Sequence, residues 1–480
     1  MMPISSPVPS ARSGVPASIL SPEFFGKYDV RGPRYTSYPT VPYWSEEVTG
    51  EVWAEHLGSR GGPGTAGAER PLAVYVHIPF CRHRCYFCAC NVIVTSQPGI
   101  ADRYLDSVER EVELVRGRLG GNRQIVQLHL GGGTPNYLNS AQMARLINIL
   151  GRNLHFAPGA EVAIEVDPRV SDADEIRRLH DVDGFNRISF GVQDFHEATQ
   201  EAIGRSQTWE KTLELGRAAR EVGFESLNID LIYGLPEQSR ASWRTTMKRF
   251  LELRPSRVAM YNFAFLPGRL AHQRRLDPSQ LPDAAEKLSM FLESNELLLS
   301  HGYRFIGMDH YALEEDSLTR ALDDGTLHRN FMGYTTLRGT DMVAFGVSAI
   351  SDAFGGYVQN TKKLSRYEEE LAGGRFPVEQ GIILSDEDTR RRWIIESLLC
   401  GGMLHRAAFE RAFGMGLQEH YGAELGRLEP FEADGLLEIS DEAIRVTAAG
   451  RFFMRNIAMV FDTYLQNTGR STSPVFSKVL

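Results

Sequence analysis

The fold of this chain is decided by the stretch Cys81-Arg-His-Arg-Cys85-Tyr-Phe-Cys88-Ala-Cys90 and by the residues that precede it. Four of the five cysteines lie in this window, and only Cys400 lies elsewhere. The preceding run, Leu72–Ile78, is apolar and β-branched, which predicts a buried strand. Pro79 ends that strand because proline has no N–H to donate to a neighbouring strand. We therefore expect the cysteines on a loop at the carboxyl end of a strand, where α/β proteins expose functional groups.

Length, charge and composition restrict the class of protein. The chain has 480 residues, which predicts two or three domains, and its net charge of -9 implies no general role in nucleic-acid binding. No apolar run approaches the roughly 20 residues of a membrane-spanning helix. Residues 1–21 are mostly Pro, Ser and Ala and lack a signal-peptide pattern, so we expect a cytoplasmic protein. Thiols stay reduced in the cytoplasm, which favours a metal-binding or redox role for the clustered cysteines.

Strand-like and helix-like segments alternate from residue 72 onward. The strand-like runs are 74–78, 125–130, 161–166, 187–192, 226–232, 258–263 and 303–308. The amphipathic runs are 103–119, 141–154, 209–222, 243–253 and 284–301. This alternation predicts βαβ units and a parallel sheet, either a full or partial barrel or a doubly wound open sheet.

The expected strand ends are rich in polar residues and glycine. These ends are residues 131–135, 165–167, 191–194, 230–236 and 307–310. Active sites of parallel α/β barrels are assembled from such ends, which favours a barrel with one central cavity. None of these strand-like runs is followed by the Gly-x-Gly-x-x-Gly pattern, and no Walker loop is present, so dinucleotide and nucleoside triphosphate binding lack their main support.

The two ends of the chain differ in character from the alternating region. Residues 32–40 are aromatic and interrupted by proline, unlike a flexible linker. After about residue 375, helical stretches (393–399, 409–413) precede a hairpin (436–439 with 444–447) and a helix over 447–461, a winged-helix-like pattern. We predict a disordered lead-in (1–26), an N-terminal segment (27–70), a barrel domain (71–375) and a C-terminal, mainly helical domain (376–480).

Several kinds of site could explain the clustered cysteines. A structural zinc site usually needs two separated Cys-x-x-Cys pairs, and only Cys85 and Cys88 form one here. Iron–sulfur cubanes are normally held by four cysteine thiolates, so a loop with three ligands leaves one iron open to a substrate or cofactor. Cys90 lies two residues beyond Cys88 and could be a fourth ligand or a separate reactive thiol. Cys400 is expected to be a buried core thiol on a helix.

The cysteine spacing and eleven wider motifs resemble one family. Cys-x3-Cys-x2-Cys after a strand is similar to the radical S-adenosylmethionine signature. The wider motifs are residues 33–40, 75–81, 85–91, 131–135, 164–168, 191–195, 228–236, 306–311, 333–336, 346–350 and 455–461. Together they resemble the oxygen-independent coproporphyrinogen III oxidases, over nearly all residues after Lys27. The resemblance implies an α/β fold: a partial (β/α)6 barrel with a parallel sheet, plus a small, mainly helical C-terminal domain.

The resemblance also implies a set of site residues. In this family, Cys81, Cys85 and Cys88 hold one [4Fe-4S] cluster, and S-adenosylmethionine chelates the remaining iron. Two S-adenosylmethionine molecules are expected. The implied binding residues are Tyr75, Phe87, Gly132, Gly133, Thr134, Glu165, Gln193, Arg205, Asp230, Ala264 and Ile350. Arg205 would pair with a methionyl carboxylate, and Ala264 and Ile350 would give apolar walls for adenine.

The reaction implied by the resemblance is an oxidative decarboxylation. S-adenosylmethionine is cleaved to methionine and a 5′-deoxyadenosyl radical, which abstracts a hydrogen from a propionate β-carbon of coproporphyrinogen III. Loss of CO2 and an electron leaves a vinyl group, and two rounds give protoporphyrinogen IX. The reaction needs a low-potential electron donor and a terminal electron acceptor. We expect a monomer.

The resemblance suggests roles for two further residues. Arg34 is a candidate for binding propionate, on a segment that would cover the barrel as a lid; alternatively it is solvated, with its tyrosine neighbours packed on the barrel wall. Cys90 is expected to act beside the substrate, in hydrogen transfer or positioning, because a fourth thiolate would block the open iron. Ala89 stands where many members have Gly, which matters only if the backbone there needs a positive φ.

Three other functions share part of this pattern. A haem-binding chaperone group has the same cysteine loop but another residue at the position of Cys90, and it lacks the motif at residues 33–38. Both features are present here, which favours the oxidase. A radical methyltransferase that uses the second S-adenosylmethionine as methyl donor, and a purely structural metal protein, are weaker alternatives.

Overall fold

The computed structural model describes residues 21–120, 123–467 and 476. Most of the predicted disordered lead-in, residues 1–20, lies outside the described residues. The chain forms two compact units. The first, here called the barrel unit, comprises Ser45–Asp283 and Gly339–Ile383; the second, here called the helical unit, comprises Met1–Trp44, Ala284–Arg338 and Leu384–Leu480. The four-segment division of the chain stays a prediction.

The barrel unit is built on a mainly parallel sheet. Strands β1 (Leu72–Ile78), β4 (Gln124–Gly132), β5 (His155–Val166), β6 (Arg187–Gln193), β7 (Ser226–Tyr233) and β8 (Arg257–Asn262) follow one another as parallel neighbours. On the other side of β1 lie parallel β13 (Asp341–Phe345) and then antiparallel β14 (Ile350–Ala353), β15 (Gly356–Asn360) and β16 (Val378–Ile383). The predicted βα alternation is therefore confirmed, whereas the antiparallel extension was not predicted.

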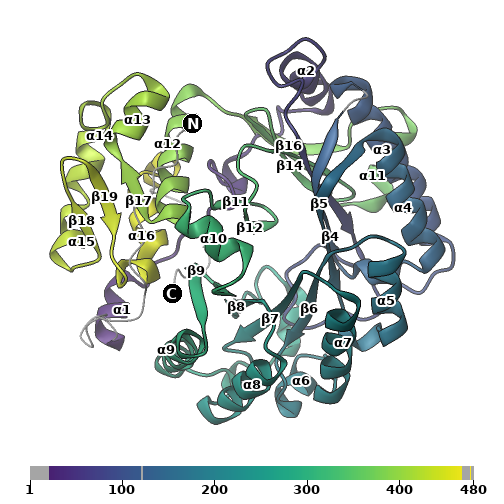
Figure 1. The fold of residues 1–480 in the computed structure, drawn as a ribbon, viewed down its shortest axis with the longest axis horizontal. Coiled ribbons are helices and arrows are strands. Elements are labelled where there is room, and N and C mark those ends of the chain that lie inside the picture. The colour runs from purple at the N-terminus through teal and green to yellow at the C-terminus, as the bar shows by residue number, and fades with distance from the viewer. Residues whose placement is uncertain (1–20, 121–122, 468–475, 477–480) are drawn as a thin grey trace. The chain divides into compact units, whose positions relative to one another are not determined.

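Helices connect these strands. They are α2 (Gly50–Gly61), α3 (Ile100–Leu119), α4 (Ser140–Asn153), α5 (Ala173–Asp181), α6 (Glu197–Ala202), α7 (Trp209–Val222), α8 (Arg240–Leu253) and α11 (Leu364–Ala372). Figure 1 shows α3, α4, α5 and α7 along one side of the strands. Residues 141–154, 209–222 and 243–253 were predicted helices and correspond to α4, α7 and α8. The shorter α5 and α6 were not predicted.

Alternation along the strands decides which side chains face the site. In β6, Ile188, Phe190 and Val192 are buried, and the residues between them are only partly buried. The same alternation leaves Glu165 of β5 and Asp230 of β7 partly exposed. Successive side chains of a strand point to opposite faces. The apolar set therefore forms the core of the sheet, and the polar set is free to line a cavity.

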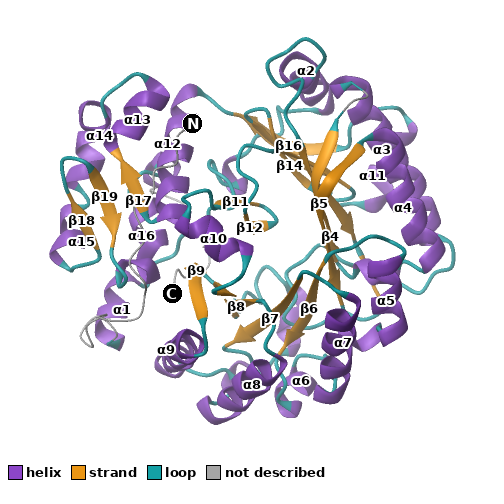
Figure 2. Ribbon diagram, viewed as in Figure 1, coloured by secondary structure: helices purple, strands orange, loops and turns teal. Residues whose placement is uncertain are grey.

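The helical unit contains small sheets among helices. Its helices are α1 (Pro22–Tyr28), α9 (Ala284–Ser300), α10 (Ser317–Asp323), α12 (Asp386–Glu396), α13 (Arg406–Phe413), α14 (Leu417–Gly426), α15 (Glu429–Ala433), α16 (Met454–Met459) and α17 (Thr463–Asn467). The strands β17 (Met403–His405), β19 (Ala443–Val446) and β18 (Leu437–Ile439) form one antiparallel sheet, around which Figure 2 shows helices. The predicted hairpin is β18–β19, so it is confirmed.

One prediction in this unit is confirmed and one was wrong. The run 303–308 forms the predicted strand, β9 (Tyr303–Gly307), which pairs with antiparallel β10 (His310–Leu313). The predicted helix over residues 447–461 is not continuous: a 3-10 turn at Gly450–Phe453 precedes α16. Cys400 is buried in the π-helical turn Ser397–Gly401, as a core thiol on a helix should be. Strands β11 (His328–Asn330) and β12 (Gly333–Thr335) pair with each other.

The aromatic N-terminal segment is anchored within the helical unit. Tyr35 and Tyr38 belong to its buried apolar core. Arg455 donates to the carbonyl oxygen of Pro33 at 2.9 Å, and Arg329 donates to those of Arg34 and Tyr35. The Arg34 side chain forms an ion pair with Asp309. These tyrosines therefore pack in the core of the helical unit, while the lid function and propionate binding by Arg34 stay predictions.

No helix among residues 21–120 and 123–467 is long and apolar enough to cross a lipid bilayer.

A buried carboxyl group joins three parts of the barrel unit. Glu111 of α3 accepts hydrogen bonds from Tyr367 Oη of α11 at 2.5 Å, from Asn360 Nδ2 of β15 at 2.6 Å and from Gly346 N at 2.8 Å. Tyr104, also on α3, donates to the carbonyl oxygen of His77 at the end of β1. The network therefore ties α3 to the part of the sheet from which the cysteine loop departs.

We expect Glu111→Ala to lower the free energy of unfolding by about 3 kcal/mol, because it leaves buried donors on Tyr367, Asn360 and Gly346 without an acceptor. Urea unfolding followed by circular dichroism measures this loss. Glu113→Ala, at an exposed position of the same helix, is the control. Equal effects of the two substitutions would contradict the proposed importance of the network.

Candidate functional site

The cysteine loop leaves β1 and is fixed by contacts on both sides. It lies between the paired short strands β2 (Phe80–Cys81) and β3 (Ile93–Val94). Tyr86 N donates to the carbonyl oxygen of Ile203 at 2.9 Å. His272 Nε2 lies 2.7 Å from the carbonyl oxygen of Cys88, and Gln273 Nε2 donates to that of Phe87 at 3.2 Å. The loop backbone is thus held by the segments that follow β6 and β8.

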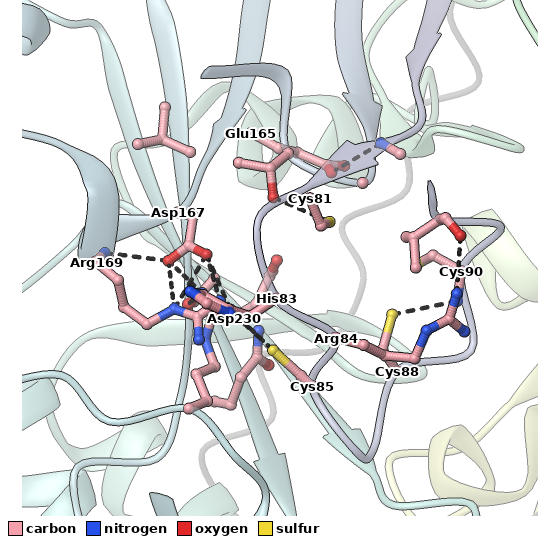
Figure 3. Close-up of a pocket in the computed structure, with 18 of the residues that line it drawn as sticks. Cys81, His83, Arg84, Cys85, Cys88, Cys90, Glu165, Asp167, Arg169 and Asp230 are labelled. Carbon is pink, nitrogen blue, oxygen red and sulfur yellow. Dashed lines mark hydrogen bonds and ion pairs between the residues drawn. The ribbon is translucent and has the colours of Figure 1, made fainter. Parts of the chain in front are cut away.

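The loop faces a cavity of about 170 Å³ at the carboxyl ends of the parallel strands (Figure 3). Twelve residues predicted to form the site line it: Cys81, Cys85, Phe87, Cys88, Cys90, Gly132, Gly133, Thr134, Glu165, Gln193, Arg205 and Asp230. The lining also includes Asp167 and Arg169. The structure therefore brings together residues that lie up to 149 positions apart, from Cys81 to Asp230, at one edge of the sheet.

The cysteine thiols have different surroundings. Cys81 Sγ lies 3.3 Å from Thr134 Oγ1, and Cys88 Sγ accepts a hydrogen bond from Cys90 N at 3.4 Å. Cys85 is buried and accepts from Arg205 Nη1 at 3.4 Å. Among the described residues, no three His, Cys, Asp or Glu side chains are grouped so as to hold a single metal ion. A cubane differs from a single ion in this respect, because it binds each thiolate through a different iron atom.

The electrostatic surroundings separate the thiols further. Hydrogen bonding from Cys90 lowers the pKa of Cys88 to about 6, and the same contact raises the pKa of Cys90 well above its usual value. Burial raises the pKa of Cys81. Thiolates, and not thiols, bind metals. Cys88 is therefore prepared as a ligand near neutral pH, whereas Cys90 retains its proton.

Two carboxyl groups on neighbouring strands also differ in charge. Burial would raise the pKa of Glu165, but the hydrogen bond from His129 (Nε2 to Oε1, 3.0 Å), the electrostatic effect of His129 and His77, and a hydrogen bond from Gly132 N together outweigh burial and lower the pKa. Burial and repulsion by Glu165 raise the pKa of Asp230 to about 7, although Asn228 donates to it at 2.8 Å. Near neutral pH Glu165 is therefore ionised, whereas Asp230 is partly protonated.

Two strand ends have unusual backbone geometry. Gly132 has φ of 115°, and a Cβ there would lie 2.6 Å from the ring of His77. Gln193 has φ of 72°, which is uncommon for a residue with a side chain. Asp194, fully buried, accepts from the backbone N–H groups of Phe195 and His196 and stabilises the turn that follows. Such strain is concentrated at functional sites.

Three predicted binding residues lie outside the cavity lining. Tyr75 of β1 stacks on His129 of β4, and its hydroxyl lies 3.1 Å from His77 Nδ1. The carbonyl oxygen of Ala264 accepts from Gln273 at 3.2 Å. Ile350 begins β14, opposite Gln359. Their predicted contacts with S-adenosylmethionine stay predictions.

The sequence interpretation gave no role to Asp167, Arg169 and His129. Asp167 accepts hydrogen bonds from Arg169 and Arg205, and His129 orients Glu165. One signal was available for the first pair: Asp167 and Arg169 flank Pro168 directly after a strand end. Nothing in the local sequence around His129 distinguishes it from a core histidine.

Stability should depend on the pH at which Asp230 ionises. The folded pKa of about 7 lies above the ordinary value of 3.8, so ionisation destabilises the folded chain, and stability falls as pH rises from about 4 through 7. Asp230→Asn stays neutral, so its urea midpoint should gain on that of the parent chain between pH 5 and pH 8. The exposed Asp174→Asn serves as control. A constant difference between Asp230→Asn and the parent would refute this assignment.

Two segments of the chain match known protein-family models, and nearly the whole chain matches known enzymes. Residues 75–250 match the Radical SAM superfamily model, and residues 384–453 match the HemN C-terminal domain model. The chain is 45% identical over 454 residues to the oxygen-independent coproporphyrinogen III oxidase of Salmonella typhimurium, covering 95% of this chain and 97% of the relative. The corresponding Escherichia coli protein is 44% identical and that of Helicobacter pylori strain 26695 is 37% identical, with the same coverage of this chain.

A solved structure agrees with these sequence matches. The structure described as "Coproporphyrinogen III oxidase (HemN) from Escherichia coli is a Radical SAM enzyme" matches with a TM-score of 0.86 and 43% identity, covering 90% of this chain and 97% of that one. The predicted fold, a radical SAM barrel with a helical C-terminal region, is thereby confirmed. The extent and level of these matches show that the chain belongs to the family of oxygen-independent coproporphyrinogen III oxidases within the radical SAM superfamily.

Proposed function

We propose that this chain converts two propionate side chains of coproporphyrinogen III into vinyl groups by anaerobic oxidative decarboxylation, giving protoporphyrinogen IX. The observation that carries the proposal is the cavity in which Cys81, Cys85 and Cys88 face the polar strand ends, in a chain 45% identical to a curated oxidase. Membership of the radical SAM superfamily implies a [4Fe-4S] cluster and S-adenosylmethionine. Together these cofactors supply, when bound, a 5′-deoxyadenosyl radical that can abstract hydrogen from an unactivated carbon.

The residues present fit these cofactors. Three thiols line one cavity, and the pKa of one of them is lowered to about 6. Arg205 is buried beside them, and its Nε has no hydrogen-bond partner among the described residues. An unpaired buried donor costs free energy that an anionic ligand would recover. We propose that Cys81, Cys85 and Cys88 bind the cluster and that Arg205 binds the methionyl carboxylate.

The remaining polar groups suit the other parts of S-adenosylmethionine. Glu165 is ionised and suits an ammonium group, since a carboxylate accepts charge-assisted hydrogen bonds. Asp230 and Gln193 suit ribose hydroxyl groups, and Gly133 and Thr134 offer backbone and hydroxyl contacts. We further propose a second S-adenosylmethionine bordered by Phe87, Gly132, Ala264 and Ile350, as the family resemblance implies. Tyr75 would likewise border these cofactors, as the resemblance implies.

We propose that Cys90 is a substrate-side thiol and not a cluster ligand. The residue is exposed, while its thiol donates to Cys88 and retains its proton to high pH. A protonated thiol can give or return a hydrogen, which a metal-bound thiolate cannot. Electrons must enter from a low-potential donor and leave to a terminal acceptor, and we propose that the chain acts as a monomer.

The direct test is anaerobic reconstitution with iron and sulfide, followed by incubation with reductant, S-adenosylmethionine and coproporphyrinogen III. We expect 5′-deoxyadenosine and a product with two vinyl groups, both detected by mass spectrometry. Tight haem binding without either product would instead indicate a haem carrier. A methylated product would indicate a methyltransferase.

The cysteine roles are separable by substitution. Cys85→Ser should lose most of the iron–sulfur absorbance near 400 nm on reconstitution, because it removes one of the three proposed thiolate ligands of the cluster. Cys90→Ser should keep that absorbance but lose vinyl product by at least tenfold, as expected for loss of a group that acts in proton or hydrogen transfer.

Cys400→Ala is the control for both variants, because Cys400 is buried in the helical unit. It should retain both absorbance and turnover. A Cys85→Ser protein with full absorbance would refute the ligand assignment. Full turnover by Cys90→Ser would remove the role proposed for Cys90 without affecting the rest.

A further inference from the structure

Two guanidinium groups approach the sulfur of Cys85. Arg205 Nη1 lies 3.4 Å from Cys85 Sγ, and Arg169 Nη2 lies 3.6 Å from it. Both arginines are also bound to Asp167, which is 7% exposed. Figure 3 shows Asp167 and Arg169 beside Cys85, on the opposite side of the cavity from Cys88 and Cys90. One carboxylate against two guanidinium groups leaves a net positive charge at this sulfur.

Arg169 is fixed independently of any ligand. Its Nε donates to Asp167 Oδ1 at 3.0 Å and its Nη2 to Oδ2 at 2.7 Å, which is a bidentate pairing. Its backbone N–H also donates to Asp167 Oδ1 at 3.1 Å, within the 3-10 turn Pro168–Val170. The remaining Nη1 reaches the carbonyl oxygen of Gly204 at 3.5 Å. Backbone and side chain are therefore both held to one carboxylate at the end of β5.

Asp167 is held in the ionised form that this pairing needs. Burial would raise its pKa, but the nearby Arg205 and Arg169 outweigh that effect and keep the pKa below its usual value. The backbone of Asp167 is also fixed, because its N–H donates a buried hydrogen bond to Asn136 Oδ1 at 3.1 Å. The position of Arg169 consequently depends on Asp167, which the sheet fixes in turn.

The two arginines differ in what else they can do. Arg205 has an unpaired buried Nε and is the residue proposed above to bind the methionyl carboxylate. Arg169 has each side-chain nitrogen bound to the protein: to Asp167, to Gly204 and to Cys85. The contact between Arg169 and the sulfur of Cys85 therefore does not depend on which ligand Arg205 binds.

Hydrogen bonds and positive charge at a cluster sulfur stabilise the reduced cluster, because the added electron makes the cluster more negative. We propose that Arg169, oriented by Asp167, donates a hydrogen bond to the thiolate of Cys85 and raises the reduction potential of the cluster that this thiolate binds. The inference rests on the proposed function, since it requires Cys85 to be a cluster ligand. It adds a residue that sets how readily an external donor reduces the enzyme.

The test is a potentiometric titration of the reconstituted full chain without S-adenosylmethionine, in which the reduced cluster is followed by electron paramagnetic resonance. The Arg169→Gln protein should show its midpoint shifted to more negative potential than the parent chain. Arg169→Lys, which keeps the charge but not the bidentate pairing, should lie between the two. Arg177→Gln, at a half-exposed position on α5, is the matched control and should not shift.

Each outcome is decisive. An unchanged or less negative midpoint in Arg169→Gln, with cluster content equal to the parent, overturns the inference and leaves the proposed function intact. If neither Arg169 variant takes up a cluster that the parent binds, Arg169 serves assembly and the inference is likewise overturned. A parent chain that binds no cluster at all, by iron analysis and absorbance, refutes the proposed function itself.

Discussion

The site depends on the convergence of parallel strands at one edge of the sheet. Because β1, β4, β5, β6 and β7 run in the same direction, their carboxyl ends deliver the cysteine loop, the glycine loop, Glu165, Gln193 and Asp230 to one cavity. Strand register is essential here, since a slip of one residue would turn each polar side chain toward the helices. The register between β6 and β7 shifts between Gly191 and Gln193, and such irregularities re-aim side chains near active sites.

Charge within the cavity is set by burial and by pairing together. Asp167 is paired with two arginines, Glu165 accepts a hydrogen bond from His129, and the pKa of Asp230 is raised by burial and by repulsion from Glu165. The cysteine loop shows the same principle, with Cys88 and Cys90 sharing one hydrogen bond but holding different protonation states. Groups of the same chemical type therefore reach different protonation states within one cavity, which lets them bind different parts of a ligand.

Much of the barrel unit could be predicted from the sequence because its signals are local. Runs such as residues 226–232 have the apolar pattern of a strand. The polar residues at the ends of these runs predict where the active-site cavity lies. The features that could not be predicted depend on contacts between residues far apart in the sequence. Strand β9 has an ordinary strand sequence, and its antiparallel pairing with β10 cannot be read from that sequence. The role of Arg169 requires knowing that Cys85, 84 positions earlier, lies within reach. The roles proposed for Arg205 and Ile350 come from the family resemblance, because no local pattern indicates them.

The close approach of Gly133 to the backbone at Pro79 bears on the thermodynamics of ligand binding. Gly133 N donates to the carbonyl oxygen of Ile78 at 2.8 Å, and a Cβ on Gly133 would lie 2.7 Å from Pro79. The glycine loop and the start of the cysteine loop are therefore held together by the protein's own contacts. Binding then needs little further ordering of the main chain, so the conformational entropy that a flexible loop would lose is not subtracted from the affinity.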